Sequence, residues 1–260
     1  MISAIFTGAL HFPGPHFSFP SGGGINEEMS LRWIHFLAGF VWIGLLYFFN
    51  LVGFPAMKQL EPPVRAKAYL AIMPRAMAWF RWSALVTVLA GLRYYYILLA
   101  ADARNSGNSR LALHWLGDWF LVWIAAYALI YPLQLPARGS LDSGWLRAVP
   151  IAAVVVAASW ATLAWNAGPQ VSNAHLSIAV GGGIGLLMLL NTWGVVWRVQ
   201  KRLIESTRLN VEHGAPMPPE AARLARWGFI ASRVGFWLSL PLLFFMGAAQ
   251  HYPFLSGIGG

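Results

Sequence analysis

The sequence contains no cysteine, and only 10% of its 260 residues are charged. Without cysteine there are no disulfides, no thiolate-ligated iron–sulfur clusters and no C-x-x-C-H attachment of a c-type haem. Soluble domains carry roughly 25% charged residues, whereas 58% of this chain is hydrophobic. The composition therefore predicts an integral membrane protein in which histidine or methionine, rather than thiolate, would hold any haem.

Acidic residues are also scarce, with 9 Asp and Glu against 18 Lys and Arg, so the formal net charge is +9. The basic residues stand in short segments between apolar runs, where positive charge normally records membrane orientation. We therefore expect membrane lipid as a partner and no nucleic acid.

The N-terminal region lacks the features of a cleaved signal. No Lys or Arg precedes Arg32, and proline and glycine interrupt the stretch HFPGPHFSFPSGGG where a signal needs an apolar helical core. We predict that residues 1–28, with His11 and His16, form a loop at the membrane interface. Residues 29–260 are predicted to form a single transmembrane helical domain.

Apolar runs of about 20 residues, the length that crosses a bilayer as a helix, occur six times. The sequence therefore predicts an all-α membrane bundle of six transmembrane helices. The predicted spans are Leu31–Phe54, Ala78–Leu99, Leu113–Leu135, Trp145–Trp165, His175–Trp197 and Trp227–Ala249.

Twelve of the 18 basic residues stand in or at the edges of the loops that follow the first, third and fifth spans. By the positive-inside rule these loops are cytoplasmic, so both termini are predicted to be periplasmic in a bacterial inner membrane. We expect the fifth span to continue as a helix beyond the membrane until a proline break. The twelve residues are Lys58, Arg65, Lys67, Arg75, Arg138, Arg147, Arg198, Lys201, Arg202, Arg208, Arg223 and Arg226.

Four histidines stand at span ends that this topology places at the outer face: His35, His114, His175 and His251. Histidine is also amphipathic and favours the interface for that reason alone. Two interpretations therefore remain, a metal or haem site and four interfacial side chains.

The residues around His35 favour a ligand. Gly39 and Trp42 follow it at i+4 and i+7 on one helix face, so a position without a side chain and a flat aromatic lie beyond the imidazole. This face offers room for a planar cofactor. In the fifth span, His175 precedes the run GGGIG, which either clears space for a cofactor or lets helices pack closely.

Asp118 stands one turn after His114 and is the only carboxylate within a predicted span. It is a candidate for orienting His114 or for acid–base catalysis together with it, since intramembrane acids are usually functional. Arg81 and Arg233 lie inside the cytoplasmic ends of their spans, where they either reach the surface or pair with an anion such as a haem propionate.

Four segments together resemble the N-terminal membrane domain of bacterial membrane-bound urate oxidases. They are LRWIHFLAGFVWIGLLYFF, MPRAMAWFRW with LAGLRYYY, GGGIGLLMLLNTW and LSLPLLFFMGAAQHYPF, in the same order along the chain. The first is also similar to the copper-resistance membrane proteins and to the haem-binding membrane protoporphyrinogen oxidase. The closing HYP with the preceding LP is the more specific part.

The resemblance implies that His35 and His251 match the family's first and last histidines. In that family a cytochrome c domain follows the membrane domain, which implies electron delivery to a c-type haem. These 260 residues contain no C-x-x-C-H motif, so we expect the cytochrome to be a separate polypeptide, along with other membrane subunits. The chain departs from the family pattern at Ala78, Ser83, Val234 and Gly235, and His175 is displaced by one turn, so we expect that urate is not its substrate.

We therefore expect a protein that holds one or two non-covalent haem b groups and transfers electrons towards a periplasmic c-type cytochrome. His35, His251, His175 and His114 are the candidate iron ligands, and Gly39, Trp42, Arg81 and Arg233 are candidate contacts to the cofactor. Two alternatives stay open. One is a membrane oxidase of a urate-like small molecule that uses Asp118 or His114, and the other is a cofactor-free subunit of a respiratory or photosynthetic complex.

Overall fold

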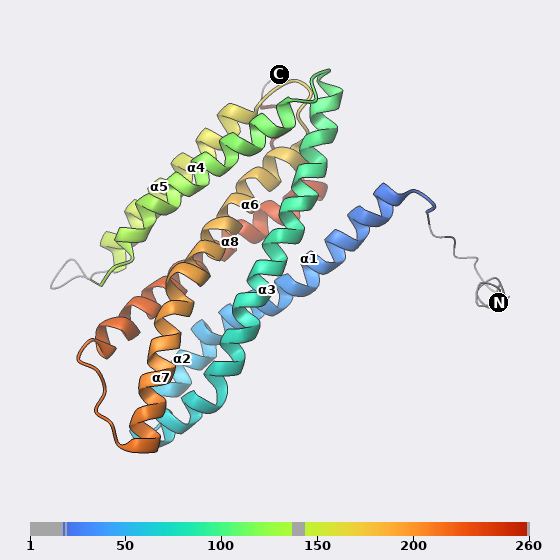
Figure 1. The fold of residues 1–260 in the computed structure, drawn as a ribbon. Helices are drawn as coiled ribbons and strands as arrows, with labels where there is room; N and C mark the ends of the chain where they lie inside the picture. The colour runs from blue at the N-terminus through green and yellow to red at the C-terminus, as the bar shows by residue number, and fades with distance from the viewer. Residues whose placement is uncertain (1–17, 19, 137–143, 259–260) are drawn as a thin grey trace, which may run out of the picture.

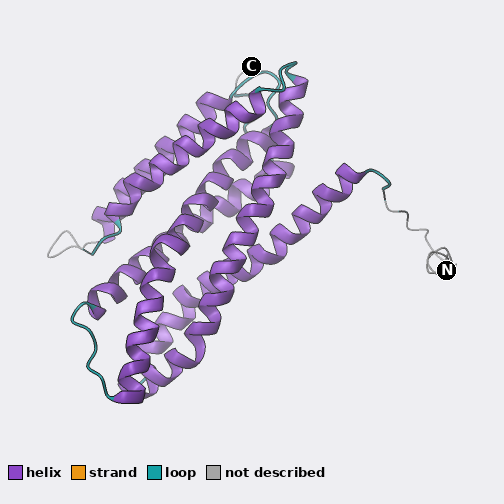
Figure 2. Cartoon of the chain, in the orientation of Figure 1, coloured by secondary structure: helices purple, strands orange, loops and turns teal. Residues whose placement is uncertain are grey.

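The computed structural model describes residues 18, 20–136 and 144–258, and in this part of the chain every regular element is a helix (Figure 2). The predicted all-α class is confirmed. The elements in chain order are α1 (Gly23–Tyr47), η1 (Phe48–Gly53), α2 (Phe54–Gln59), α3 (Pro62–Asn105), α4 (Leu111–Leu133), α5 (Gly144–Asn166), α6 (Asn173–Asn191), η3 (Thr192–Val196), α7 (Trp197–His213) and α8 (Ala221–His251).

Six helical segments in the described residues are long and apolar enough to cross a membrane, as predicted. Two of them contain short π-helical stretches, η1 and η3, which connect their α-helical neighbours without a break. Many large apolar side chains on the outside of the bundle are exposed, including Trp33, Phe40 and Trp160, as expected for contact with lipid. The chain is therefore a multi-pass membrane protein.

Successive spans run in opposite directions (Figure 1). One end of the bundle holds the α3–α4 and α5–α6 connections and the end of α8, and we call it the His175 end. The opposite end holds α2, the start of α3, α7 and the start of α8, and we call it the basic end, because most of the residues that predicted the orientation belong to it.

The first helix begins at Gly23, before the loop boundary predicted at residue 28, so residues 23–28 belong to α1. Polar contacts support this extension. The Asn26 side chain donates to the Pro20 carbonyl at 2.9 Å, and Glu27 forms an ion pair with Arg93 of α3 at 2.7 Å. The rest of the predicted interfacial loop, including His11 and His16, lies almost wholly outside the described residues.

The third helix, α3, is much longer than the predicted span Ala78–Leu99. It starts at Pro62, where a missing N–H costs little because the first helical amides have no partner in the helix. It continues through Pro74 to Asn105. This longer helix carries Asp102 into the bundle, where it pairs with His175 of α6.

The segment α6–η3–α7 continues past the apolar region, as predicted. It ends at His213, where Gly214 adopts a left-handed conformation with φ 65° and its N–H bonds back to the Asn210 carbonyl. Such a backbone favours glycine and is a common way to end a helix. Three prolines follow before α8 begins.

Helix α6 is the centre of the bundle. In the most apolar 18-residue stretch of its segment 72% of the residues are buried, against at most 39% in the other spans, and α6 contacts α3, α4, α5 and α8. Glycines permit this packing, because a Cβ on Gly183 would lie 1.8 Å from the Trp123 indole and one on Gly181 would lie 3.0 Å from Phe245. The run GGGIG therefore serves close helix packing, one of its two predicted roles.

Helix α1 lies at the edge of the bundle and packs mainly along α3 (Figure 1). Its link to α8 combines packing of the Tyr47 and Phe236 rings, whose centroids are 5.0 Å apart, with polar contacts nearby. Asn50 donates to the Leu46 carbonyl and to Ser232 Oγ, both at 2.9 Å, and the hydroxyls of Ser239 and Tyr47 are hydrogen-bonded at 3.2 Å.

Candidate functional site

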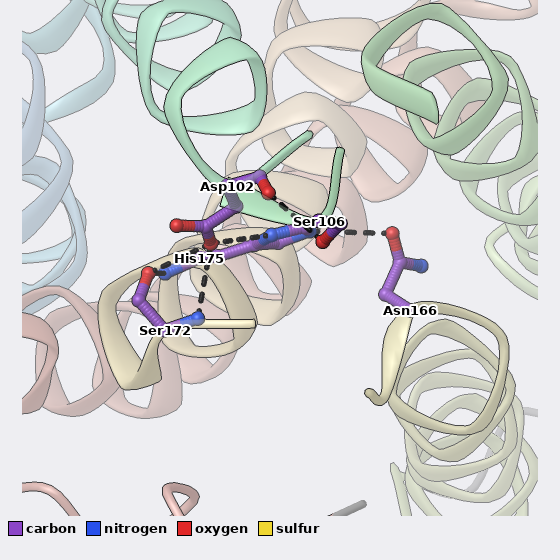
Figure 3. Close-up of polar contacts among 5 residues, drawn as sticks. All are labelled: Asp102, Ser106, Asn166, Ser172 and His175. Atoms are coloured by element: carbon purple, nitrogen blue, oxygen red, sulfur yellow. Dashed lines mark hydrogen bonds and ion pairs between the residues drawn. The ribbon is translucent and has the colours of Figure 1, made fainter. Parts of the chain in front are cut away.

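A buried ion pair joins α3 to α6 at the His175 end. The Nδ1 atom of His175 lies 3.1 Å from Oδ2 of Asp102, and the two side chains are 0% and 7% exposed. Figure 3 shows that the imidazole lies between Asp102 on one side and Asn166 on the other. We call Asp102, Asn166, Ser172 and His175 the Asp102–His175 cluster.

The start of α6 holds the carboxylate in place. Ser172 is the N-cap of α6, and its Oγ accepts from the backbone N–H of His175 at 3.2 Å. Its own N–H and hydroxyl both donate to Asp102 Oδ2, at 3.0 and 2.9 Å. With His175, Oδ2 therefore receives three hydrogen bonds next to the positive end of a helix dipole, which is a favourable setting for an ionised carboxylate.

The orientation of Asn166 determines what His175 Nε2 does. Asn166 Nδ2 donates to the Thr162 carbonyl at 2.7 Å. If the amide were flipped, Asn166 Oδ1 would face the Thr162 carbonyl oxygen, and neither atom can donate. Oδ1 therefore faces His175 Nε2, at 3.3 Å. Because Oδ1 only accepts, Nε2 carries a hydrogen and donates it. On its other side the ring faces Asp102, with Nδ1 3.1 Å from Oδ2, so both ring nitrogens of His175 have protein partners.

Aromatic rings surround the imidazole on its remaining sides. Trp115 of α4 and Tyr95 of α3 make edge contacts with His175 at ring-centroid distances of 5.0 and 5.8 Å. The Tyr95 hydroxyl is buried and has no protein partner among the described residues. Trp119 packs against Tyr95 and donates to the Ala179 carbonyl of α6 at 2.7 Å. Protein side chains therefore enclose the His175 imidazole, and both of its ring nitrogens have protein partners.

His35 has a different environment. Its Nδ1 lies 2.8 Å from the Thr87 carbonyl of α3, and since a carbonyl only accepts, Nδ1 carries the hydrogen. The ring lies against Gly91, where a Cβ would come within 2.8 Å of it. The other nitrogen, Nε2, has no protein partner in the described residues. A carbonyl that receives one ring N–H and so fixes the other nitrogen as the ligand is the usual arrangement of a metal-bound histidine.

The face that continues from His35 packs against protein. Gly39 lies opposite Thr87 of α3, whose methyl group would be 3.7 Å from a Cβ on the glycine, and Trp42 is 2% exposed in the core. This stripe is therefore a helix-packing seam between α1 and α3, and the room expected for a planar cofactor beyond His35 is filled.

His35 also lies at a different depth from the other candidate histidines. Its partner Thr87 precedes Asp102 by fifteen positions on the same helix, a separation of about 22 Å at 1.5 Å per residue. The expected cluster of four histidines at one face is thus divided, with His35 deep in the span and His114, His175 and His251 at the His175 end.

His114 and Asp118 form the predicted one-turn pair, with His114 Nε2 3.3 Å from Asp118 Oδ2. The two side chains are 73% and 28% exposed, so the pair lies on the outside of α4, apart from the Asp102–His175 cluster. The contact between Asp118 and His114 is therefore present, but the pair faces outwards, without the enclosure that acid–base catalysis usually has.

His251 is the last residue of α8 and is exposed. Its turn is held by Asn173, the first residue of α6. The Asn173 amide donates to the Ala249 carbonyl at 3.1 Å, and its oxygen accepts from the Leu255 N–H at 3.1 Å. His251 is therefore fixed near the start of α6, and its imidazole remains free to contact a partner.

Arg81 and Arg233 lie in the half of the bundle nearer the basic end. The Arg81 guanidinium is 3.8 Å from the centroid of the Trp197 ring and also contacts Trp82 and Trp193. The Arg233 guanidinium lies over Phe229 and Phe236, at 5.2 and 5.9 Å. Both cations are therefore held by aromatic rings, far along the bundle from His175.

The residues of the described ranges contain no group of three or more His, Asp or Glu side chains placed to hold a metal ion. Within these ranges, no hydrogen bond, ion pair or ring contact joins any two of the four candidate histidines. Of the two ring nitrogens of His35, only Nδ1 has a protein partner in the described residues, which leaves Nε2 as a candidate metal ligand. His175 leaves no such nitrogen, because both of its ring nitrogens already have protein partners.

The sequence interpretation missed three members of the buried cluster: Asp102, Ser172 and Asn166. Asp102 was overlooked because the second span was predicted to end at Leu99. A signal was present, since Ser172 precedes His175 by three residues at a predicted helix start, a typical N-cap spacing. Asn166 and Asp102 had no local signal for their pairing with His175.

Comparison of this chain with protein-family models, with curated proteins and with solved structures found no match.

Proposed function

We propose that this chain is a membrane-embedded haem b protein, or the haem-binding subunit of a larger membrane complex, that passes electrons towards a periplasmic c-type cytochrome. The observation that supports this most directly is the orientation of His35, whose Nδ1–H bonds to the Thr87 carbonyl at 2.8 Å and leaves Nε2 as the nitrogen with a lone pair. A haem bound there would supply a one-electron centre in surroundings of low polarity.

The residues around His35 perform two tasks in this proposal. Thr87 sets the tautomer and the rotation of the ring, and Gly91 leaves the space in which the ring lies. His251 is the candidate for a second contact at the His175 end, because it is exposed on a turn fixed by Asn173. The resemblance to the membrane domain of urate oxidases supports the direction of electron transfer and the separate cytochrome partner.

The acid–base alternative now rests on Asp102 and His175 rather than on Asp118 and His114. A carboxylate that orients an imidazole is the usual arrangement of a general base. His175 is 0% exposed, however, and its Nε2 donates to Asn166, so a substrate would have to displace Asn166 to reach it. For this reason we favour the haem protein over a small-molecule oxidase.

A reduced-minus-oxidised absorption spectrum of the purified chain tests the proposal. We expect the bands of a b-type haem in the wild type, and loss of haem or a change of spin state in His35→Ala. His213→Ala is the matched control, since His213 is an exposed residue at the end of α7, and its spectrum should equal that of the wild type.

A wild-type protein without haem after expression with excess haem would overturn the proposal in favour of a cofactor-free subunit. Urate-dependent oxygen uptake by the purified chain would instead support the oxidase. We expect none, because of the departures at Ala78 and Val234 from the urate oxidase pattern.

A further inference from the structure

A cleft of about 1110 Å³ opens at the basic end, between the segment Leu189–Ser206 and the start of α8. It is larger than most small-molecule pockets, which measure roughly 300–1,000 Å³. Its two halves differ in chemistry. One half is lined by apolar and aromatic side chains from the membrane-spanning part of the bundle, and the other by basic side chains of α7.

The apolar half is formed by Leu190, Trp193 and Trp197 of the continuous segment α6–η3–α7, with Leu85 of α3 and Tyr127 of α4 beside them. The Tyr127 hydroxyl donates to the Leu190 carbonyl at 3.1 Å, so this wall presents few free polar groups. Trp197 also lies against the Arg81 guanidinium, which holds the indole in place.

The polar half carries Arg198, Lys201 and Arg202, at i, i+3 and i+4, and therefore on one face of α7. All three are exposed. Two acids also line the cleft, Glu205 and Glu220. Glu205 is neutralised by its ion pair with Arg208 at 3.1 Å, so the basic charge exceeds the acidic charge at the mouth of the cleft.

We infer that this cleft binds an anionic phospholipid of the surrounding bilayer, with its phosphate at Arg198, Lys201 and Arg202 and an acyl chain along Leu190, Trp193 and Trp197. The arrangement of the cleft supports a phospholipid as its ligand. Its basic side chains lie just beyond the apolar span, at the depth expected for lipid headgroups, and its apolar wall lies within the span. Basic pockets between membrane helices at such an end are typical sites for anionic lipids. The inference does not depend on haem binding.

The test uses full-length protein reconstituted in phosphatidylcholine bilayers that contain a minority of phosphatidylglycerol. The protein is extracted in mild detergent, and the retained lipids are counted by native mass spectrometry. We expect phosphatidylglycerol to be enriched over its bulk fraction. In the triple variant Arg198→Gln, Lys201→Gln, Arg202→Gln, the enrichment should be lost, since each basic residue near an anionic surface contributes about fivefold in affinity and the three together about a hundredfold.

The matched control is the triple variant Lys58→Gln, Lys67→Gln, Arg75→Gln. These residues are also exposed at the basic end but lie outside the cleft, so the enrichment should remain. A second variant, Ala221→Trp, narrows the cleft without changing its charge and should also reduce the retained phosphatidylglycerol. Elution volume in size-exclusion chromatography and helical content by circular dichroism show whether each variant folds.

Three results would overturn the inference. Equal retention of phosphatidylglycerol and phosphatidylcholine by the wild type would show no preference for an anionic lipid. An equal loss in both triple variants would show a general effect of surface charge. Complete displacement of phosphatidylglycerol by inorganic phosphate alone would show a phosphate site that makes no use of the apolar wall. The haem spectrum should be the same in all these variants, which separates this test from that of the proposed function.

Discussion

The Nε2 atom of His175 donates to Oδ1 of Asn166 across 3.3 Å, and the Asn166 amide is held in that orientation by the Thr162 carbonyl. This relationship connects α5 to α6 and determines which atoms of the imidazole carry hydrogen. We therefore expect protein labelled with ¹⁵N-histidine to show two protonated ring nitrogens for His175, assigned by their loss in His175→Gln. A resonance typical of an unprotonated ring nitrogen would contradict the hydrogen-bond assignment.

Removing the charge of Asp102 should destabilise the bundle. Asp102→Asn leaves the buried His175 without its counter-ion, and the loss of one partner of a buried pair costs about 3–5 kcal/mol. Urea unfolding in detergent micelles, followed by tryptophan fluorescence, measures the change in free energy. The control is Asp118→Asn, which removes the exposed one-turn pair with His114 and should cost less than about 1 kcal/mol. Equal costs for the two variants would argue against a buried ion pair.

Gly183 and Gly182 are adjacent but should respond differently to alanine. A Cβ on Gly183 would overlap the Trp123 indole at 1.8 Å, whereas one on Gly182 would meet Trp119 at 3.7 Å, an ordinary contact. Gly183→Ala should therefore destabilise the protein by about 1–3 kcal/mol or more, while Gly182→Ala should be neutral or slightly stabilising. Unfolding of the two variants in the same detergent makes the comparison, and similar stabilities would show that α4 and α6 are not packed this closely.

The proposed haem ligand can be displaced without being mutated. Gly91→Ala would place a Cβ 2.8 Å from the His35 ring and so force the imidazole away from the Thr87 carbonyl. We expect altered haem bands and a loss of about 1 kcal/mol of stability for the broken hydrogen bond. Gly44→Ala on α1 meets nothing within 4 Å and serves as the control. An unchanged spectrum in Gly91→Ala would remove the support that this geometry gives to His35 as a ligand.

Thiol labelling tests the predicted membrane orientation of the chain. The experiment is simple because the sequence contains no cysteine. Ser256→Cys and Glu212→Cys each introduce a single thiol at an exposed position, the first at the His175 end and the second in α7. With both termini periplasmic, a membrane-impermeant maleimide added to intact bacterial cells that express the variants should label Ser256→Cys, and should label Glu212→Cys only after lysis. The reverse pattern would invert the proposed topology.

The fold could be predicted to a large extent, because the length of an apolar run and the distribution of basic residues are local properties. The six spans and the continuation of the fifth one past the membrane were predicted in this way. The C-terminal limit of α3 could not be predicted in this way, because its last turn contains the charged Asp102. This carboxylate is stabilised there by Ser172 and His175, which belong to the start of another helix.

The candidate site was predicted less well, and His35 shows the reason. The periodicity of the first span correctly placed His35, Gly39 and Trp42 on one face. It did not reveal what covers that face, which is α3 rather than a cofactor at Gly39 and Trp42. His175 was identified from its position near a helix start. Its partners Asp102 and Asn166 come from other helices, and their identity depends on tertiary packing that a single sequence does not encode locally.

The π-helical turn η3 also sets the direction in which α7 points its side chains. The Trp197 N–H bonds back five positions to the Thr192 carbonyl, whereas an α-helix bonds back four. Each residue advances an α-helix by about 100°, so deleting one residue from Thr192–Val196 would rotate every later side chain of the segment by that angle relative to α6. Arg198, Lys201 and Arg202 would then turn away from the cleft while the transmembrane core stayed in register. The extra residue of this π-helical turn thus sets the rotational angle between the apolar side chains of α6 and the basic side chains of α7.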